Sequence, residues 1–228
     1  MVTAHPDDVD FGSAGSVATW IDAGISVTYC LVTNGEAGGD NREMPRNEMA
    51  QLRQAEQTTA AAAVGVHDLR FLGYPDGRVE PTLDLRRDIS RVIRQVRPQR
   101  VVSQSPQRTF ERVYAGHPDH LAAGEATVCA VYPDSRNPFA HPELLHDERL
   151  EPWTVPQLWI AARGDANVSV DITDALDRKI AALCSHESQI TDRERIRAMV
   201  SEWARANAQR AGLPDDRYAE SYLAVDTR

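Results

Sequence analysis

Apolar residues in the first half of the chain alternate between short continuous runs and stretches with helical spacing. The short runs are rich in β-branched residues, which is typical of buried parallel strands. We expect strands at 2–4, 25–33, 69–72 and 100–104. We expect helices in the intervening stretches, up to Ala23, over 48–64 and over 83–96. This alternation predicts a Rossmann-like, three-layer α/β fold with a mostly parallel sheet.

The second half of the chain continues this pattern around a proline-rich segment. Pro118 suits the first turn of a helix that runs to about Val131. Residues 132–156 are irregular, and a loop of this length inside a domain is usually functional. We expect strands at 157–161 and 168–172 forming a hairpin around Gly164-Asp165, helices at 173–183 and 192–209, and an edge strand or a cover over the site at 218–225. Residues 1–228 are expected to form one domain, with a C-terminal helix and tail at 191–228.

Composition and charge narrow the class of protein. Hydrophobic residues make up 42% of the chain and charged residues 26%, which is ordinary for a globular domain. The formal net charge is −9, and no tract rich in Lys or Arg is present. Binding to nucleic acid or to an anionic membrane surface is therefore disfavoured. A homo-oligomer is compatible with the sequence, with the proline-rich segment as a candidate interface.

The cysteines and the N-terminal region indicate where the protein works. Cys30, Cys129 and Cys184 are far apart and form no C-x-x-C pair. A disulfide framework and a thiolate metal site are both disfavoured, and buried thiols are the simpler interpretation. No signal-like apolar region follows Met1, and no apolar run approaches 18 residues. We expect a cytoplasmic protein without a membrane span.

The first candidate for chemistry is the segment His5-Pro6-Asp7-Asp8, at the predicted junction of the first strand and helix. An imidazole with a carboxylate is a suitable ligand set for zinc. Consecutive residues point in different directions, so the two aspartates can serve different purposes. An aspartate capping a helix is the alternative, and this motif alone slightly favours that alternative.

A second segment, His117-Pro118-Asp119-His120, resembles the first and shifts the preference from a helix cap toward a metal site. On a helix the two histidines share a face, while Asp119 points elsewhere and could orient a histidine. The alternative is a helix start with solvent-facing histidines. Both segments lie at strand-to-helix junctions on the same predicted sheet edge, a coincidence that unrelated helix starts do not need. Together they favour a metal site.

The number of ligands can be anticipated without assigning all of them. A catalytic zinc takes three protein ligands and leaves one position for water. His5, one aspartate of the first segment, and one or both of His117 and His120 would be sufficient. Residue spacing leaves open whether His117 is a ligand or a catalytic neighbour.

These two segments resemble those of the LmbE-like, or PIG-L-type, zinc-dependent de-N-acetylases. Other features of the family follow in the same order over roughly residues 1–190. They are Thr33-Asn34-Gly35 at a strand end, Arg53 and Glu56 on a helix, Asp76-Gly77, and His186 with Gln189 after the helix that carries Lys179. The chain departs from the family in having only four residues before His5, so either the first strand is short or the start of the sequence is truncated.

The resemblance implies a role for each candidate residue. His5, Asp8 and His120 would hold one zinc ion per chain. Asp7 would be the general base toward the attacking water, and His117 a cationic group that stabilises the oxyanion. Asp119 would support a neighbouring histidine. Residues expected at the substrate are Arg53, Asp76, Tyr114 and His186.

The implied reaction is hydrolysis of the N-acetyl group of an N-acetylglucosamine-containing small molecule. One alternative is an amidase acting on a thiol conjugate or another small amide. A metal-dependent phosphoesterase holding two ions is a further alternative. Substrate specificity is expected in the loops at 34–47, 105–116 and 132–156.

Overall fold

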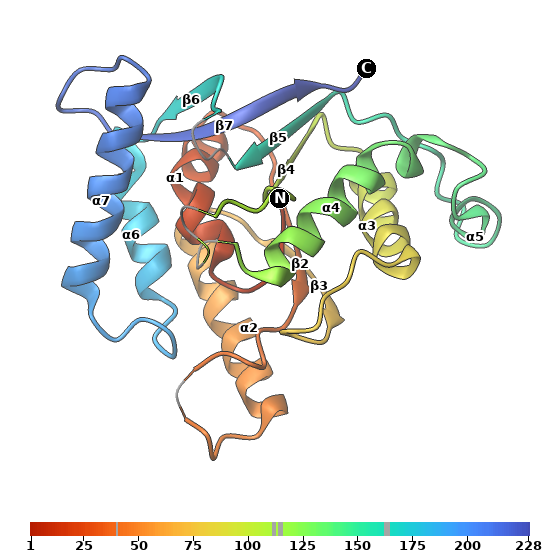
Figure 1. The fold of residues 1–228 in the computed structure, drawn as a ribbon, viewed down its shortest axis with the longest axis horizontal. Coiled ribbons are helices and arrows are strands. Elements are labelled where there is room, and N and C mark those ends of the chain that lie inside the picture. The colour runs from red at the N-terminus through yellow and green to blue at the C-terminus, as the bar shows by residue number, and fades with distance from the viewer. Residues whose placement is uncertain (40, 111–112, 114–115, 162–164) are drawn as a thin grey trace.

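A central sheet of seven strands organises the computed structural model, which describes residues 1–39, 41–110, 113, 116–161 and 165–228 (Figure 1). The strands are β1 (Val2–Thr3), β2 (Thr28–Thr33), β3 (Asp68–Tyr74), β4 (Arg100–Ser103), β5 (Gln157–Ala161), β6 (Val168–Asp171) and β7 (Ala219–Asp226). Their order across the sheet is β3-β2-β1-β4-β5-β7-β6. The first five strands in this order are parallel, and β7 runs antiparallel to both of its neighbours. The predicted α/β fold with a mostly parallel sheet is confirmed.

Helices cover both faces of the sheet. They are α1 (Asp8–Asp22), α2 (Arg46–Ala63), α3 (Leu83–Val96), α4 (Pro118–Val131), α5 (Pro142–His146), α6 (Leu176–Cys184) and α7 (Arg193–Arg210), with short 3-10 helices at Asp134–Arg136 and Thr173–Ala175. Alternate residues of β2 face opposite layers, as the twofold period of a strand requires. Cys30 and Val32 pack in the cluster that includes α3 and α4, whereas Tyr29 and Leu31 pack in the cluster that includes α1 and α2.

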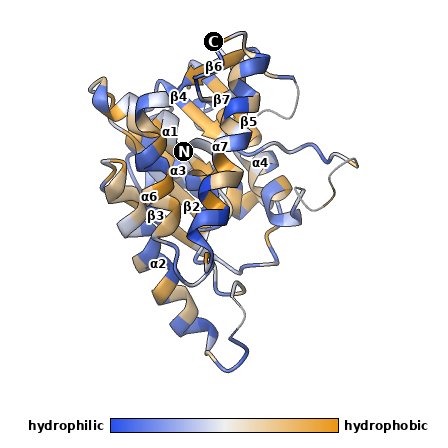
Figure 2. Cartoon of the chain, turned by 90° about the vertical axis from the view of Figure 1, so that its left-hand side faces the viewer, coloured by the Kyte–Doolittle hydropathy of each residue, from blue (hydrophilic) through white to orange (hydrophobic). Residues whose placement is uncertain are grey.

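Hydropathy along the elements explains why they pack in this way. Figure 2 shows hydrophobic residues concentrated on the strands, while α2 carries hydrophilic residues along much of its surface. Helix α3 places Leu85, Ile89 and Ile93 on one buried face, which matches the spacing used to predict it. No helix in the described part of the chain is long and apolar enough to cross a membrane.

The late strands pair differently from the sequence-based expectation. The predicted hairpin of β5 with β6 is wrong, because each of these strands pairs with β7. Gly164 of that predicted turn lies outside the described residues. The C-terminal segment is also not an edge strand, since β6 occupies the edge. Tyr222 of β7 is almost completely buried, and this burial favours an interior position for the strand.

The proline-rich segment 132–156 is ordered around one buried arginine. Arg94 of α3 donates hydrogen bonds to several backbone carbonyl oxygens of this segment. The acceptors are the carbonyls of Asp134, Ser135, Asn137, Ala140 and Leu150. The segment also contains α5 and the 3-10 helix at Asp134–Arg136. The expectation of an irregular loop is therefore only partly correct.

The strand order places a switch point at the start of the chain. The chain passes from β1 to β2 and β3 on one side, and later to β4 and β5 on the other side of β1. Open α/β sheets bind ligands outside the carboxyl ends of the strands at such a point. Strand β1 has two residues and leads directly into the first motif. Both α1 and α4 begin at this edge, immediately beside the two predicted motifs.

Candidate active site

The connection from β1 to α1 brings the first motif into a tight turn. Asp7 has a left-handed backbone, with φ 87° and ψ −27°. The backbone N–H groups of Asp10 and Phe11 both donate to the Asp7 carbonyl oxygen, which starts the helix. The Asp8 side chain returns to the turn and accepts a hydrogen bond from the His5 backbone N–H at 2.7 Å. The turn therefore holds the ring of His5 beside the carboxylate of Asp8.

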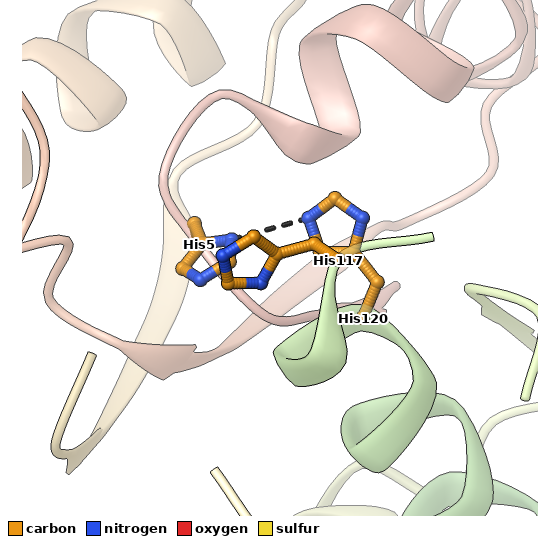
Figure 3. A group of neighbouring side chains, drawn as sticks. All are labelled: His5, His117 and His120. Atoms are coloured by element: carbon orange, nitrogen blue, oxygen red, sulfur yellow. Dashed lines mark hydrogen bonds between the residues drawn. The ribbon is translucent and has the colours of Figure 1, made fainter. Parts of the chain in front are cut away.

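The side chains of His5, Asp8 and His120, from the two motifs, converge at one point. Figure 3 shows the rings of His5 and His120 side by side, together with His117. His5 Nδ1 lies 3.2 Å from His120 Nε2 and 3.4 Å from Asp8 Oδ2, and His120 Nε2 lies 3.0 Å from Asp8 Oδ1. Two ligands of a tetrahedral zinc, each about 2.0–2.1 Å from the ion, stand roughly 3.4 Å apart. The spacing of these donor atoms therefore fits one small divalent ion.

The second nitrogen of His5 is held by two buried carboxylates. His5 Nε2 lies 3.1 Å from Asp76 Oδ1 and 3.2 Å from Asp119 Oδ2. Asp119 is itself held by the backbone N–H groups of Gly77 and Val79. Because carboxylates accept hydrogen bonds, the proton of a neutral His5 ring lies on Nε2, and the lone pair lies on Nδ1. That lone pair faces Asp8 and His120, as metal ligation requires.

The electrostatics of the cluster also fit a cation. Burial alone would lower the pKa of His5, but hydrogen bonds to Asp119, Asp76 and Asp8 raise the pKa to about 12. Burial would raise the pKa of Asp8, but His120 and His5 hold it well below its usual range. The carboxylates thus favour positive charge at this point, and a bound metal ion supplies positive charge.

Asp7 has different surroundings from Asp8, although the two residues are adjacent. Its Oδ2 accepts a hydrogen bond from Arg53 Nη2 at 3.1 Å. Arg53 also donates to the carbonyl oxygens of Pro6 and Gly35, at 2.7 and 3.0 Å. Burial, followed by the charge of Asp8, raises the pKa of Asp7 to about 7. A carboxylate with a pKa near neutrality suits general base chemistry.

His117 precedes α4 and borders the cluster. Its ring centroid lies 4.9 Å from that of His5 and 5.3 Å from that of His120. The Asp119 backbone N–H donates to His117 Nδ1 at 3.2 Å, so a neutral ring carries its proton on Nε2. Burial and the positive charge on His5 lower the pKa of His117. A neutral His117 ring offers its Nε2–H as a hydrogen-bond donor, and the cationic role expected from the family resemblance stays a prediction.

Three of the residues expected at the substrate have hydrogen-bond or ion-pair partners within the protein. Arg53, Asp76 and His186 are 4%, 5% and 0% exposed, respectively. Asp76 Oδ2 accepts a hydrogen bond from the Ala37 backbone, and His186 Nε2 lies 2.8 Å from Asp10 Oδ2. These contacts show that the three side chains are held by the protein itself, and their contact with a substrate stays a prediction. Tyr114 lies outside the described residues.

One buried residue near the site was not anticipated from the sequence. Gln57 of α2 accepts a hydrogen bond from the Asp7 backbone N–H at 2.7 Å. The available signal was its position one helical turn after Arg53, which places the two side chains on one face of α2.

The fold and the site together define an α/β protein with a candidate metal centre at the switch point of its sheet. The chain belongs to the PIG-L family, whose model, described as GlcNAc-PI de-N-acetylase, matches residues 1–131. The family resemblance inferred from the two motifs is thereby confirmed.

Individual relatives match well beyond the N-terminal part. The chain is 31% identical to the diacetylchitobiose deacetylase of Thermococcus kodakarensis, over 84% of this chain and 69% of that protein. It is 32% identical to a probable N-acetyl-α-D-glucosaminyl L-malate deacetylase 2 of Bacillus cereus, over 83% and 82% of the two chains. Both relatives are named as deacetylases of acetylated amino sugars.

Solved structures confirm the fold over nearly the whole chain. The N,N'-diacetylchitobiose deacetylase of Pyrococcus horikoshii, in complex with an inhibitor, superposes with a TM-score of 0.89 at 26% identity and covers 98% of this chain and 81% of that one. The 4-carboxy-2-hydroxymuconate hydratase of Pseudomonas putida has the same fold, with a TM-score of 0.80 at 20% identity over 100% and 95% of the two chains. Because one fold hosts different reactions, the chemistry has to be argued from the site.

Proposed function

We propose that this protein is a zinc-dependent hydrolase that removes the N-acetyl group from an N-acetylglucosamine-containing small molecule. The observation that carries the proposal is the convergence of His5 Nδ1, Asp8 and His120 Nε2 beside the separate carboxylate of Asp7. The named activities of the relatives that are 31% and 32% identical support the choice of an acetylated amino sugar.

His5, Asp8 and His120 are the residues that would hold the metal. Two imidazoles and a carboxylate form a ligand set that zinc accepts in catalytic sites, where the remaining position stays open. A bound zinc would supply Lewis-acid polarisation and a more acidic water. Asp119 and Asp76 would maintain the ligand by keeping the proton of His5 on Nε2.

The remaining residues of the site account for the proton transfers and the developing charge. Asp7 takes a proton from the attacking water while a bond forms between that oxygen and the acetyl carbon. His117 donates from Nε2 to the carbonyl oxygen, which gains negative charge. Asp7 then delivers its proton to the nitrogen as the C–N bond breaks, and acetate and a free amine leave. The hydrogen bond from Arg53 orients the Asp7 carboxylate for these two proton transfers.

A two-metal phosphoesterase is less consistent with the site. A second group of buried donors consists of His5, Asp76 and Asp119. This second group shares His5 with the proposed ligand set of His5, Asp8 and His120. The His5 nitrogen that belongs to the second group is Nε2, which carries the hydrogen-bonded proton. One imidazole would have to bind two ions and lose that proton. The carboxylates are therefore better explained as supports of a single metal site.

The proposal is tested by measuring acetate and free amine released from a panel of compounds. The panel contains N,N'-diacetylchitobiose, an N-acetylglucosaminyl malate and an N-acetylglucosaminyl inositol. We expect equal amounts of acetate and amine from at least one compound, loss of activity after chelation, and recovery with added zinc. Absence of release from every compound, or activity that survives chelation, would contradict the proposal. Release of a larger acid from another amide would instead favour the amidase.

A further inference from the structure

A chain of buried hydrogen bonds extends from Asp7 into the protein interior, away from the metal ligands. The Asp7 backbone N–H donates to Gln57 Oε1 at 2.7 Å, and Gln57 Nε2 donates to Asp10 Oδ2 at 2.9 Å. His186 Nε2 lies 2.8 Å from the same Asp10 oxygen. The side chains of Gln57, Asp10 and His186 are all completely buried. The proton transfers described above do not use these three residues.

The chemistry of the partners determines the orientation of the Gln57 amide. A backbone N–H can only donate, so it must face the carbonyl oxygen of the amide. On the other side, the amide nitrogen of Gln57 faces Asp10 Oδ2, which accepts its hydrogen bond. A flipped amide would lose both hydrogen bonds inside a buried site, where unmade bonds are costly. Gln57 is thus held in one orientation by groups on both sides.

The backbone that Gln57 contacts is in a conformation that aspartate rarely adopts. Asp7 has φ 87°, in the left-handed region that costs energy for residues other than glycine. Hydrogen bonds hold the peptide groups on both sides of Asp7. Arg53 binds the Pro6 carbonyl, Gln57 binds the Asp7 N–H, and the first turn of α1 binds the Asp7 carbonyl. This conformation directs Asp7 to Arg53 and Asp8 to the histidines.

The far end of the chain is anchored by α6 and the residues that follow it. Lys179 Nζ donates to the backbone carbonyls of Asp10 and Phe11, at 2.9 and 2.6 Å. Lys179 also pairs with the buried carboxylate of Glu220 in β7 at 2.7 Å. Lys179 and His186 therefore hold Asp10 by its backbone and its side chain. Both lie beyond residue 131, where the family match ends.

We propose that Gln57 is a positioning residue for the catalytic base, and that Asp10 and His186 fix Gln57 in place. The proposal rests on the function proposed above in one respect, the assignment of Asp7 as the base. Gln57 holds the strained backbone of Asp7, and through it the direction of the carboxylate. Small displacements of a catalytic group can cost about 100-fold in rate. Loss of Gln57 should therefore reduce turnover without removing a ligand or a substrate contact.

The test compares three variants with the unmodified protein. Gln57→Met keeps the length of the side chain and removes both hydrogen bonds. The double variant Gln57→Glu with Asp10→Asn exchanges acceptor and donor between the two positions and keeps the hydrogen bond to the Asp7 N–H. Gln51→Met is the matched control, because Gln51 is an exposed glutamine on the same helix.

The readouts are kcat and KM on the best compound of the panel, zinc content, and amide hydrogen exchange over residues 4–12. For Gln57→Met we expect a fall in kcat of about 10- to 100-fold, a change in KM below about threefold, full zinc content and faster exchange at Asp7. The double variant should recover at least about tenfold in kcat and restore slow exchange. Gln51→Met should match the unmodified protein.

Three outcomes would overturn the positioning role. They are an unchanged kcat and exchange rate in Gln57→Met, a loss of zinc that accounts for the loss of rate, and a double variant no better than Gln57→Met. If the unmodified protein releases acetate from none of the compounds, the proposed function fails. Hydrogen exchange at Asp7 still decides whether Gln57 holds that backbone, because this measurement needs no substrate.

Discussion

At the scale of single residues, the adjacent carboxylates of Asp7 and Asp8 have opposite environments. Asp8 lies between two histidines that favour its ionised form, and its pKa falls. Asp7 is buried beside the charge of Asp8, and its pKa rises to about 7. The left-handed backbone at Asp7 separates the two side chains. One carboxylate is therefore suited to hold a metal and its neighbour to accept a proton.

Substitution of the proposed base tests this division directly. Asp7→Asn keeps the size of the side chain and removes its basicity. We expect kcat to fall by about 100- to 10,000-fold while zinc content stays at one ion per chain. Measurement of turnover together with metal analysis checks this expectation. Near-normal turnover of the zinc-loaded variant would show that Asp7 is not the base.

The two histidines of α4 should respond differently to removal. His120→Ala removes a proposed ligand, so we expect zinc affinity to fall by more than about 100-fold. His117→Ala removes a proposed oxyanion donor, so we expect zinc affinity to persist and kcat to fall by about 100- to 1,000-fold. Competition titration with a zinc indicator separates the two cases. Weak zinc binding by His117→Ala would instead identify His117 as a ligand.

At the scale of elements, the position of α4 controls the geometry of the site. This helix carries Asp119 and His120, and His117 precedes its first residue. It packs closely on the segment that follows β4, where Gly124 allows the approach. A Cβ atom at Gly124 would lie 2.6 Å from the Gln104 carbonyl oxygen and 2.9 Å from the Pro106 nitrogen. Gln104 in turn accepts a hydrogen bond from the Ala4 backbone, next to His5.

Gly124→Ala should therefore disturb both stability and the site. We expect the free energy of unfolding to fall by about 1–3 kcal/mol, because backbone atoms on the facing segment have to move. Zinc affinity should fall as α4 shifts away from His5. Urea denaturation and zinc titration measure the two effects. Gly12→Ala in α1 is the control, since a Cβ there meets nothing within 4 Å and alanine favours a helix. Equal stability of the two variants would contradict the close packing of α4.

At the scale of the whole molecule, a buried ion pair in the C-terminal third of the chain joins that part to the helix that begins at the candidate site. Lys179 is the only lysine of the chain, and Lys179 and Glu220 are 3% and 4% exposed. The Glu220 carboxylate also accepts hydrogen bonds from the backbone N–H groups of Gly15 and Ser16 in α1. Three elements, α1, α6 and β7, are joined at this ion pair. It connects β7, the last strand along the chain, to α1, the helix that starts at the candidate active site.

Breaking this pair should be costly. Lys179→Met leaves the Glu220 carboxylate buried without its cation, so we expect the free energy of unfolding to fall by about 3–5 kcal/mol. Arg197→Met provides the control, because the pair of Arg197 with Asp177 is largely exposed and should contribute at most about 1 kcal/mol. Chemical denaturation of both variants gives the comparison. If both variants lowered the free energy of unfolding by the same small amount, the buried pair would not be a major contributor to stability.

Local patterns in the sequence were enough to predict the α/β class, the helix at 118–131 and the two motifs at one sheet edge. These features depend on residues within a few positions of one another, such as His117 and His120 on one helix turn. Imidazole and carboxylate groups at this spacing then indicate a metal site, and that inference needs no knowledge of how the helices and strands pack.

Contacts between distant segments depended on the tertiary structure. His186 and Asp10 are 176 positions apart, and Gln57 and Asp7 are 50 apart, so no local pattern pairs them. These two contacts join α1, α2 and the segment after α6 behind the candidate site. The insertion of β7 between β5 and β6 likewise depends on burial by both neighbouring strands. Residue chemistry and local spacing thus identified the candidate residues, whereas long-range packing decided which atom of each residue faces which partner.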